Sequence, residues 1–240
     1  AWRRAASCGG AWPEMNAGLL HRLFPPQAPM SWRELLRSAA AAGIAIGLNA
    51  WISHLIVPAE YRVYLAASLG ASTILAMVVY HSPLSQPWAI VGGHLAGALS
   101  GLLAAALIPG VVLACLFAMV LAVLLQVAGR GLHAPGGGTA LLPILAGSAI
   151  QSAGFGFLAV VLINTLVLVA AALVFNNLLP GRRYPMAFAP KPLTPVQPVF
   201  REEDLLAALR SMEGYIDVSP DDLELIYEKA RDHLRQHWNG

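Results

Sequence analysis

Residues 63–129 read VYLAASLGASTILAMVVYHSPLSQPWAIVGGHLAGALSGLLAAALIPGVVLACLFAMVLAVLLQVAG, and none of them is Asp, Glu, Lys or Arg. A soluble protein needs charged side chains to cover its surface. A hydrocarbon layer, in contrast, excludes ionised side chains at a cost of about 3 kcal/mol each. The segment is too long for all of its residues to avoid the surface of a soluble protein. It therefore predicts several membrane-spanning helices.

The whole chain supports this interpretation. Of its 240 residues, 57% are hydrophobic and 12% are charged, whereas soluble domains average about 25% charged residues. This composition excludes a soluble domain and bulk disorder. The net charge of +2 gives no reason to expect nucleic acid as a partner. Cys8 and Cys115 form neither a disulfide framework nor a zinc motif. We expect no cofactor and no enzymatic activity.

Breaks rich in proline, glycine and polar residues divide the apolar region into helices. A helix needs about 20 apolar residues to cross about 30 Å of hydrocarbon. The sequence predicts an all-α bundle of about six spans, of which the fifth is short or re-entrant. The spans are expected at residues 38–57, 63–80, 88–108, 111–128, 139 to about 151, and from there to Phe175.

Basic residues near the ends of the spans predict the orientation. Arg33 and Arg37 precede the first span, and Arg182 and Arg183 follow the last. Lys and Arg accumulate on the cytoplasmic side of membrane proteins, and an even number of spans puts all four residues on one side. We expect an integral protein of the plasma membrane (the inner membrane of a bacterium) with both termini in the cytoplasm.

Four regions follow from the composition. Residues 1–37 form a cytoplasmic leader, residues 38–180 form the transmembrane domain, and residues 181–199 form a proline-rich linker. Residues 200–240 predict a C-terminal hairpin of two amphipathic helices. Such a hairpin is too small to be stable alone, so it is expected to dock on a partner, on the membrane domain or on a second copy.

Two similar breaks interrupt the helices of the transmembrane domain. His81-x-Pro83 follows the second span and His133-x-Pro135 follows the fourth, and each precedes a glycine-rich segment. Broken helices in a membrane leave backbone polar groups unpaired, so they occur only inside protein or along a wet cavity. Transporters use such half-helix ends as solute sites. The breaks therefore predict a solute site.

The chemistry of these segments favours an anion. Helix N-termini bind anions through backbone N–H groups. No Asp or Glu, the usual partners of a cation in a membrane, occurs between residues 63 and 181. The predicted site comprises His81, Ser82, Gly92, Gly93, His94, Arg130, His133, Gly136, Gly137, Gly138 and Thr139. Alternatively, the glycines shape turns, and the histidines bond backbone carbonyls, gate a proton or bind a metal.

Glycines at helical spacing indicate close helix packing. Gly93, Gly97 and Gly101 share one face of the third span, and Gly43 and Gly47 share one face of the first. Small residues let two membrane helices approach closely. These faces could pack within one bundle or between copies of the chain, which makes a homo-oligomer a further expected partner.

Both breaks resemble a known family. The residues that carry the resemblance are Ser82-Pro83-Leu84-Ser85-Gln86-Pro87, Gly92-Gly93-His94 and His133-Ala134-Pro135-Gly136-Gly137-Gly138-Thr139-Ala140. Over about residues 40–180 the chain resembles the HPP family of integral membrane proteins, but it has Ala134 in place of the first proline of the family's His-Pro-Pro motif. The resemblance implies a transport role, with four or so spans. Because a plant member is associated with nitrite, it also implies a nitrite-like anion.

These observations predict a transporter of a small anion. Its expected partners are the lipid bilayer and the anion. A membrane metalloenzyme that uses His81, His94 and His133 is one alternative. A non-transporting assembly or sensor subunit that acts through residues 200–237, which resemble the segment before the CBS domains of some bacterial family members, is another.

Overall fold

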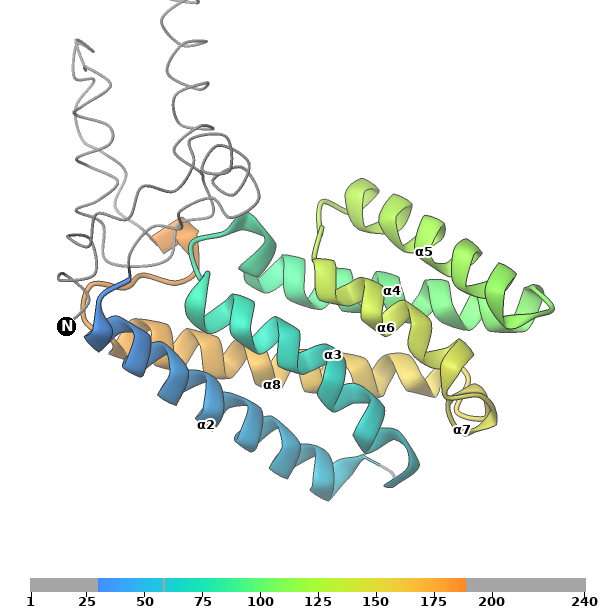
Figure 1. Cartoon of the computed structure of the whole chain (residues 1–240), viewed down its shortest axis with the longest axis horizontal. Helices are drawn as coiled ribbons and strands as arrows, with labels where there is room; N and C mark the ends of the chain where they lie inside the picture. The colour runs from blue at the N-terminus through green and yellow to red at the C-terminus, as the bar shows by residue number, and fades with distance from the viewer. Residues whose placement is uncertain (1–29, 58, 189–240) are drawn as a thin grey trace, which may run out of the picture. The chain divides into compact units, whose positions relative to one another are not determined.

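The computed structural model of the chain describes residues 30–57 and 59–188 (Figure 1), and within these residues it contains helices and no strands. The all-α prediction is confirmed. The helices are α2 (Trp32–Ile56), α3 (Ala59–Val78), η2 (Pro83–Ser85), α4 (Pro87–Leu107), α5 (Val111–Ala128), α6 (Ala134–Leu145), α7 (Ser148–Gln151), α8 (Gly156–Leu178) and η3 (Met186–Phe188). The predicted hairpin, residues 200–240, lies outside the described residues.

Six of these helices build the bundle, and successive ones run in opposite directions (Figure 1). Helix α4 packs against α5, α6 and α8, and α3 packs against α2, α6 and α8. The central helices α3, α4, α6 and α8 therefore surround the interior, while α2 and α5 lie at its sides. This arrangement brings the break after α3 and the break before α6 to the same end of the bundle.

Four of the described helices are long and apolar enough to cross a membrane, namely α2, α4, α5 and α8. Helix α6 has 12 residues and is about 18 Å long at 1.5 Å per residue, which agrees with a short fifth span. The outer helices expose large apolar side chains, as a lipid-facing surface requires. Val112 of α5, for example, is 80% exposed.

Several helix starts differ from the prediction, and α3, for example, begins at Ala59 rather than at residue 63. Helix α2 begins at Trp32, six residues before the expected residue 38. Helix α6 begins at Ala134 rather than at Thr139, and α4 begins at Pro87, so Gly92 lies inside α4 and not at its start. Proline is tolerated in the first turn of a helix because the N–H that it lacks would have no partner there. The prolines therefore start α4 and α6 rather than delay them, whereas Ser31 caps the start of α2.

A buried ion pair fixes one end of the bundle. Arg182, placed by the sequence among the orienting charges beside a span, is 2% exposed, and its partner Glu34 of α2 is 3% exposed. The Arg182 guanidinium also donates to Met77 O at 2.9 Å and to Asn176 Oδ1 at 2.7 Å. It lies 4.5 Å from the centre of the Tyr80 ring. One side chain thus ties together α2, α3 and α8.

Candidate functional site

The two predicted breaks meet at His133. Its Nδ1 lies 2.7 Å from the carbonyl oxygen of Leu84, which belongs to η2 in the first break. Its backbone N–H donates to Gln126 Oε1 of α5 at 2.9 Å. Ser82 holds η2 in place because its hydroxyl accepts the N–H of Leu84 at 3.2 Å. Residues about 50 positions apart in the sequence are therefore in direct contact.

Five buried side chains form one connected group around this contact, which we name the histidine–hydroxyl cluster. Its members are Ser68 and Ser72 of α3, His94 of α4, His133, and Thr139 of α6. Ser72 Oγ lies 2.7 Å from His94 Nε2 and 2.8 Å from His133 Nε2. Thr139 Oγ1 lies 2.6 Å from both His94 Nδ1 and Ser68 Oγ. The cluster joins α3, α4 and α6 inside the bundle.

Simple hydrogen-bond rules fix the direction of this chain when both imidazoles are neutral. A carbonyl only accepts, so His133 Nδ1 carries the proton and His133 Nε2 accepts one from Ser72. The Ser72 hydroxyl has a single proton, and its bond to His133 Nε2 at 2.8 Å is shorter than its alternative bond to the Ser68 carbonyl oxygen at 3.3 Å. Ser72 therefore accepts from His94 Nε2–H. His94 Nδ1 then accepts from Thr139. The donors run in one direction, from Thr139 through both rings to the Leu84 carbonyl, and the Ser68 hydroxyl beside Thr139 donates to the Pro135 carbonyl oxygen at 3.0 Å.

Glycines allow this close assembly. A Cβ atom added to Gly93 would collide with His133 Cβ, and one added to Gly97 would collide with Gly136 O. Glycine at these positions lets α4 and α6 approach until His94 reaches Thr139. These contacts agree with the close packing predicted for Gly93 and Gly97. Gly136, for which the sequence predicts a site or a turn, packs against Gly93 in the same way. A Cβ at Gly137 would meet Met119 Sδ at 3.4 Å.

Other predicted site residues lie apart from the cluster or beside it. Arg130 is exposed, with a left-handed φ of 52°. The His81 ring lies against the Tyr80 ring, with 3.9 Å between the ring centroids and an angle of 40° between the ring planes. Burial lowers the pKa of His81, nearby Arg182 lowers it further, and Glu34 partly offsets this. Of the predicted set, the structure brings together His94, His133 and Thr139. Gly92 packs against the Trp88 ring, and Gly138 lies beside Ser68 Oγ.

Three serines were missed in the sequence analysis. Ser68 and Ser72 are four residues apart, so they share one face of α3, and two hydroxyls at this spacing in the charge-free stretch of residues 63–129 were the available signal. Ser85 of η2 is fully buried, and its hydroxyl has no hydrogen-bond partner among the described residues. An unpaired buried hydroxyl costs about 1–3 kcal/mol. Ser85 thus offers a free donor next to Leu84.

The three-histidine metal site is not assembled. Within residues 30–57 and 59–188, no three His, Cys, Asp or Glu side chains lie close enough together to hold a metal ion. His94 and His133 approach each other with 5.0 Å between ring centroids, but the partners of the two rings described above do not include His81. The shared hydroxyl of Ser72 occupies the position between the two imidazoles.

Comparison with known proteins agrees with the sequence motifs. The family description "HPP, transmembrane region" matches residues 27–185. Two curated transmembrane proteins of Dictyostelium discoideum are similar to the chain. One is 30% identical over 60% of this chain and 47% of its own length, and the other is 35% identical over 51% and 44%. The chain thus spans about half the length of these relatives. No solved structure matches it.

Proposed function

The chain belongs to the HPP family of integral membrane proteins, and we propose that it carries a small anion across the membrane, with nitrite as the first candidate. The observation that carries the proposal is the meeting of both breaks at the histidine–hydroxyl cluster, inside the bundle. Ionisable side chains within a membrane protein, such as His94 and His133 here, are costly and often mark a solute or ion path. The role proposed is transport rather than catalysis.

The polar groups of this region favour an anion over a metal cation. Between residues 63 and 181 the chain has no Asp or Glu, and Glu34 is committed to Arg182. Hard cations prefer carboxylate and carbonyl oxygens as ligands, whereas an anion accepts hydrogen bonds from N–H and O–H groups. The cluster and Ser85 offer such donors.

Ser85 and His133 indicate where the anion would first bind. Ser85 Oγ is a buried donor without a described partner, and the adjacent Leu84 carbonyl holds the Nδ1–H of His133. An anion that contacts Ser85 could draw this N–H away from the carbonyl. Because α4 and α6 pack backbone to backbone at Gly97, we expect only an anion of a few atoms to fit.

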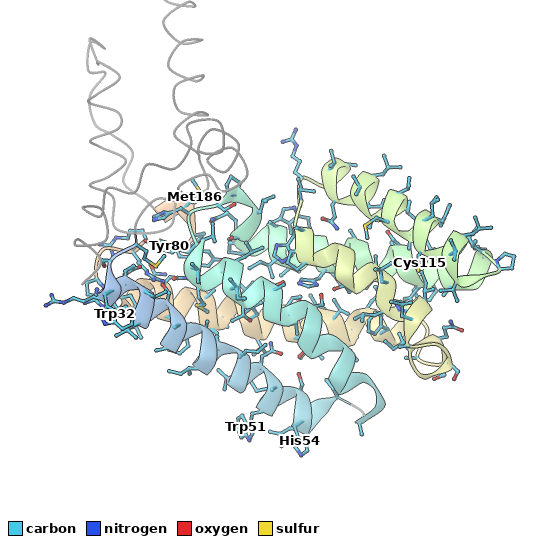
Figure 2. The ribbon with its side chains drawn as sticks, viewed as in Figure 1. Trp32, Trp51, His54, Tyr80, Cys115 and Met186 are labelled. Carbon is cyan, nitrogen blue, oxygen red and sulfur yellow. The ribbon has the colours of Figure 1, made fainter. Side chains whose placement is uncertain are left out.

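We propose the plasma membrane as the location, with the start of α2 and the residues after α8 in the cytoplasm. Trp32 and Tyr80 lie at one end of the helices, and Trp51 and His54 lie at the other (Figure 2). Aromatic side chains concentrate at both membrane–water interfaces. Arg33, Arg37 and Arg183 lie near the first of these ends, which supports its cytoplasmic position.

Uptake by proteoliposomes tests this function. The purified full chain is placed in liposomes, and the initial uptake of nitrite, nitrate, formate and chloride is compared with that of protein-free liposomes. We expect uptake of at least one anion. We expect His133→Ala to slow it about tenfold or more, the equivalent of one lost hydrogen bond to a charged ligand. If none of the anions enters, or if His133→Ala transports as fast as the wild type, the proposal is wrong.

A matched control separates the site from general packing. Ser100 of α4 is fully buried, and its hydroxyl donates to Ala96 O of its own helix at 2.7 Å. Ser100→Ala removes a buried hydroxyl outside the cluster. Its uptake rate should stay within about twofold of the wild-type rate, which corresponds to a free-energy change of about 0.5 kcal/mol or less.

A further inference from the structure

We infer that the anion moves together with a proton, which the chain of hydrogen bonds through His94 and His133 receives and holds. This inference rests on the proposed function and names the ion coupled to it. It is carried by two observations: the charge balance of the cluster, and the continuity and fixed direction of its hydrogen bonds.

The charge balance comes first. A buried anion needs a compensating charge, because the desolvation of an unpaired ion costs several kcal/mol. Arg130 is exposed, and Arg182 is already paired with Glu34. The cluster itself has no permanent cation. A proton on one of its imidazoles would supply the missing positive charge, since histidine is the side chain that gains a proton most readily near neutral pH.

The surroundings of His94 contain little else that titrates. The titratable side chain that faces it is His133, at 5.0 Å between ring centroids. The packed elements otherwise contribute hydroxyls from α3 and α6, and neither α6, α8 nor η2 contains a charged residue. Cys115 of α5 packs in a separate apolar cluster. Glu60 and Arg62 of α3 lie about 12 Å and 9 Å along the helix from Ser68, at 1.5 Å per residue.

The continuity of the bonds provides the path. The Ser68 hydroxyl donates its own proton to the Pro135 carbonyl, so a second proton taken up by Ser68 can pass to Thr139, and that of Thr139 can pass to His94 Nδ1. The proton on His94 Nε2 then passes to Ser72, and that of Ser72 passes to His133 Nε2. Only O–H and N–H bonds form and break. The net result is one added proton, with both nitrogens of His133 protonated and one positive charge beside η2.

This end point joins the proton to the anion. The protonated His133 carries its charge next to the Leu84 carbonyl, and Leu84 is followed in η2 by Ser85, whose buried hydroxyl has no described partner. An anion bound there would neutralise the imidazolium. Loss of the proton from His133 Nδ1 would end the attraction and release the anion. The cluster would therefore bind and release the two ions as a pair, which makes transport electrically neutral.

Two driving forces applied to proteoliposomes distinguish a paired movement from movement of the anion alone. A pH-sensitive dye in the lumen reports protons, and nitrate or nitrite uptake is measured above the leak of protein-free liposomes. For paired movement, an outside that is one pH unit more acidic should drive about tenfold accumulation, since one pH unit is worth 1.36 kcal/mol. The lumen should acidify with the anion, and a potassium–valinomycin membrane potential should not change the rate.

The outcomes separate this inference from the proposed function. If the anion enters under the membrane potential without acidifying the lumen, the coupling is wrong and the transport function remains. If no anion enters under either force, both are wrong. If the lumen acidifies with the anion under the pH gradient alone, both are supported.

Two variants test the path itself. Thr139→Val keeps the shape of the side chain but removes the hydroxyl that bridges Ser68 and His94, whereas Thr139→Ser keeps the hydroxyl. We expect the accumulation ratio to fall from about tenfold to about one in Thr139→Val and to persist in Thr139→Ser. His94→Gln, which can hydrogen-bond but takes up no proton, should behave as Thr139→Val. Accumulation that persists in both Thr139→Val and His94→Gln would overturn the path.

Discussion

His133 connects the parts of the site through opposite sides of its ring. Its Nδ1 bonds the Leu84 carbonyl in η2, and its Nε2 bonds Ser72 in α3. The ring is fully buried, so each nitrogen needs a partner. Any movement of this ring changes both contacts at once. A ligand that competes for one nitrogen of His133 would therefore change the contact with α3 as well as the contact with η2.

Arg182 and Glu34 provide a test at the residue scale. Removal of one partner from a buried ion pair leaves an uncompensated charge, which costs about 3–5 kcal/mol. We expect Glu34→Gln to lower the free energy of unfolding in detergent by this amount. Arg183→Gln, at the exposed neighbouring position, should leave it nearly unchanged. Equal stability of the two variants would contradict the buried pair.

His81 gives a prediction about pH. Its pKa is lowered by burial and by Arg182, so the unfolded chain binds a proton more readily than the folded one below the ordinary value of 6.5. The neutral ring therefore contributes stability above that pH, and this stability is lost as the pH falls. In His81→Gln, the fall in melting temperature between pH 7.5 and 5.5 should be smaller than in the wild type. If the melting temperature of His81→Gln falls as much as that of the wild type, the lowered pKa assigned to His81 is contradicted.

At the scale of elements, the contact of α4 with α6 positions the cluster. Gly93, Gly97 and Gly101 face α6, and a Cβ atom on any of them would lie closer than 3.0 Å to atoms of His133, Gly136 or Ala140. Backbones this close leave no room for adjustment by side-chain rotation. The hydrogen bond between His94 and Thr139 thus depends on the close approach that the glycines Gly93, Gly97 and Gly101 allow.

Alanine substitutions test this contact. Gly97→Ala should force α4 and α6 apart and reduce the yield of folded, monodisperse protein. Gly47→Ala should not, because a Cβ atom at Gly47 has nothing within 4 Å and alanine favours the helix by about 1 kcal/mol. Size-exclusion profiles and melting temperatures measure both variants. A Gly97→Ala protein as stable as Gly47→Ala would show that the helices are not this close.

Helices α4 and α6 show how much of the structure could be predicted from the sequence. Their existence, the apolar character and the glycine stripe were predictable from composition and spacing. Their first turns were not, because proline can either end a helix or begin one. The contact between His133 and Leu84 was also beyond prediction, since it depends on how η2 folds back. Ser72 was missed because a single hydroxyl in an apolar helix more often bonds its own backbone.

At the scale of the whole molecule, six antiparallel helices bring the start of α2 and the end of α8 to the same end of the bundle (Figure 1). The buried Arg182–Glu34 pair joins the two helices there. The histidine–hydroxyl cluster lies in the same half of the helix bundle, because His133 precedes α6 and His94 is in the second turn of α4. A path for an anion would therefore have its polar part near one face of the membrane.

Labelling of introduced cysteines tests this orientation. In a chain with Cys8→Ser and Cys115→Ser, Arg183→Cys after α8 and Ala59→Cys at the start of α3 place thiols at opposite ends of the bundle, and both positions are exposed. A membrane-impermeant maleimide should label Ala59→Cys in intact cells and Arg183→Cys only in inverted vesicles. Labelling of both from the same side would contradict the topology.

The central claim is that an anion crosses at the histidine–hydroxyl cluster, and Ser72 lies at the middle of it. The most direct measurement is the initial rate of anion uptake into proteoliposomes by Ser72→Ala and Ser100→Ala, two loss-of-hydroxyl changes at fully buried positions. Ser72→Ala leaves His94 Nε2 and His133 Nε2 without their shared partner. It should therefore slow uptake about tenfold or more, while Ser100→Ala transports as the wild type does. Equal rates for the two variants would contradict the claim.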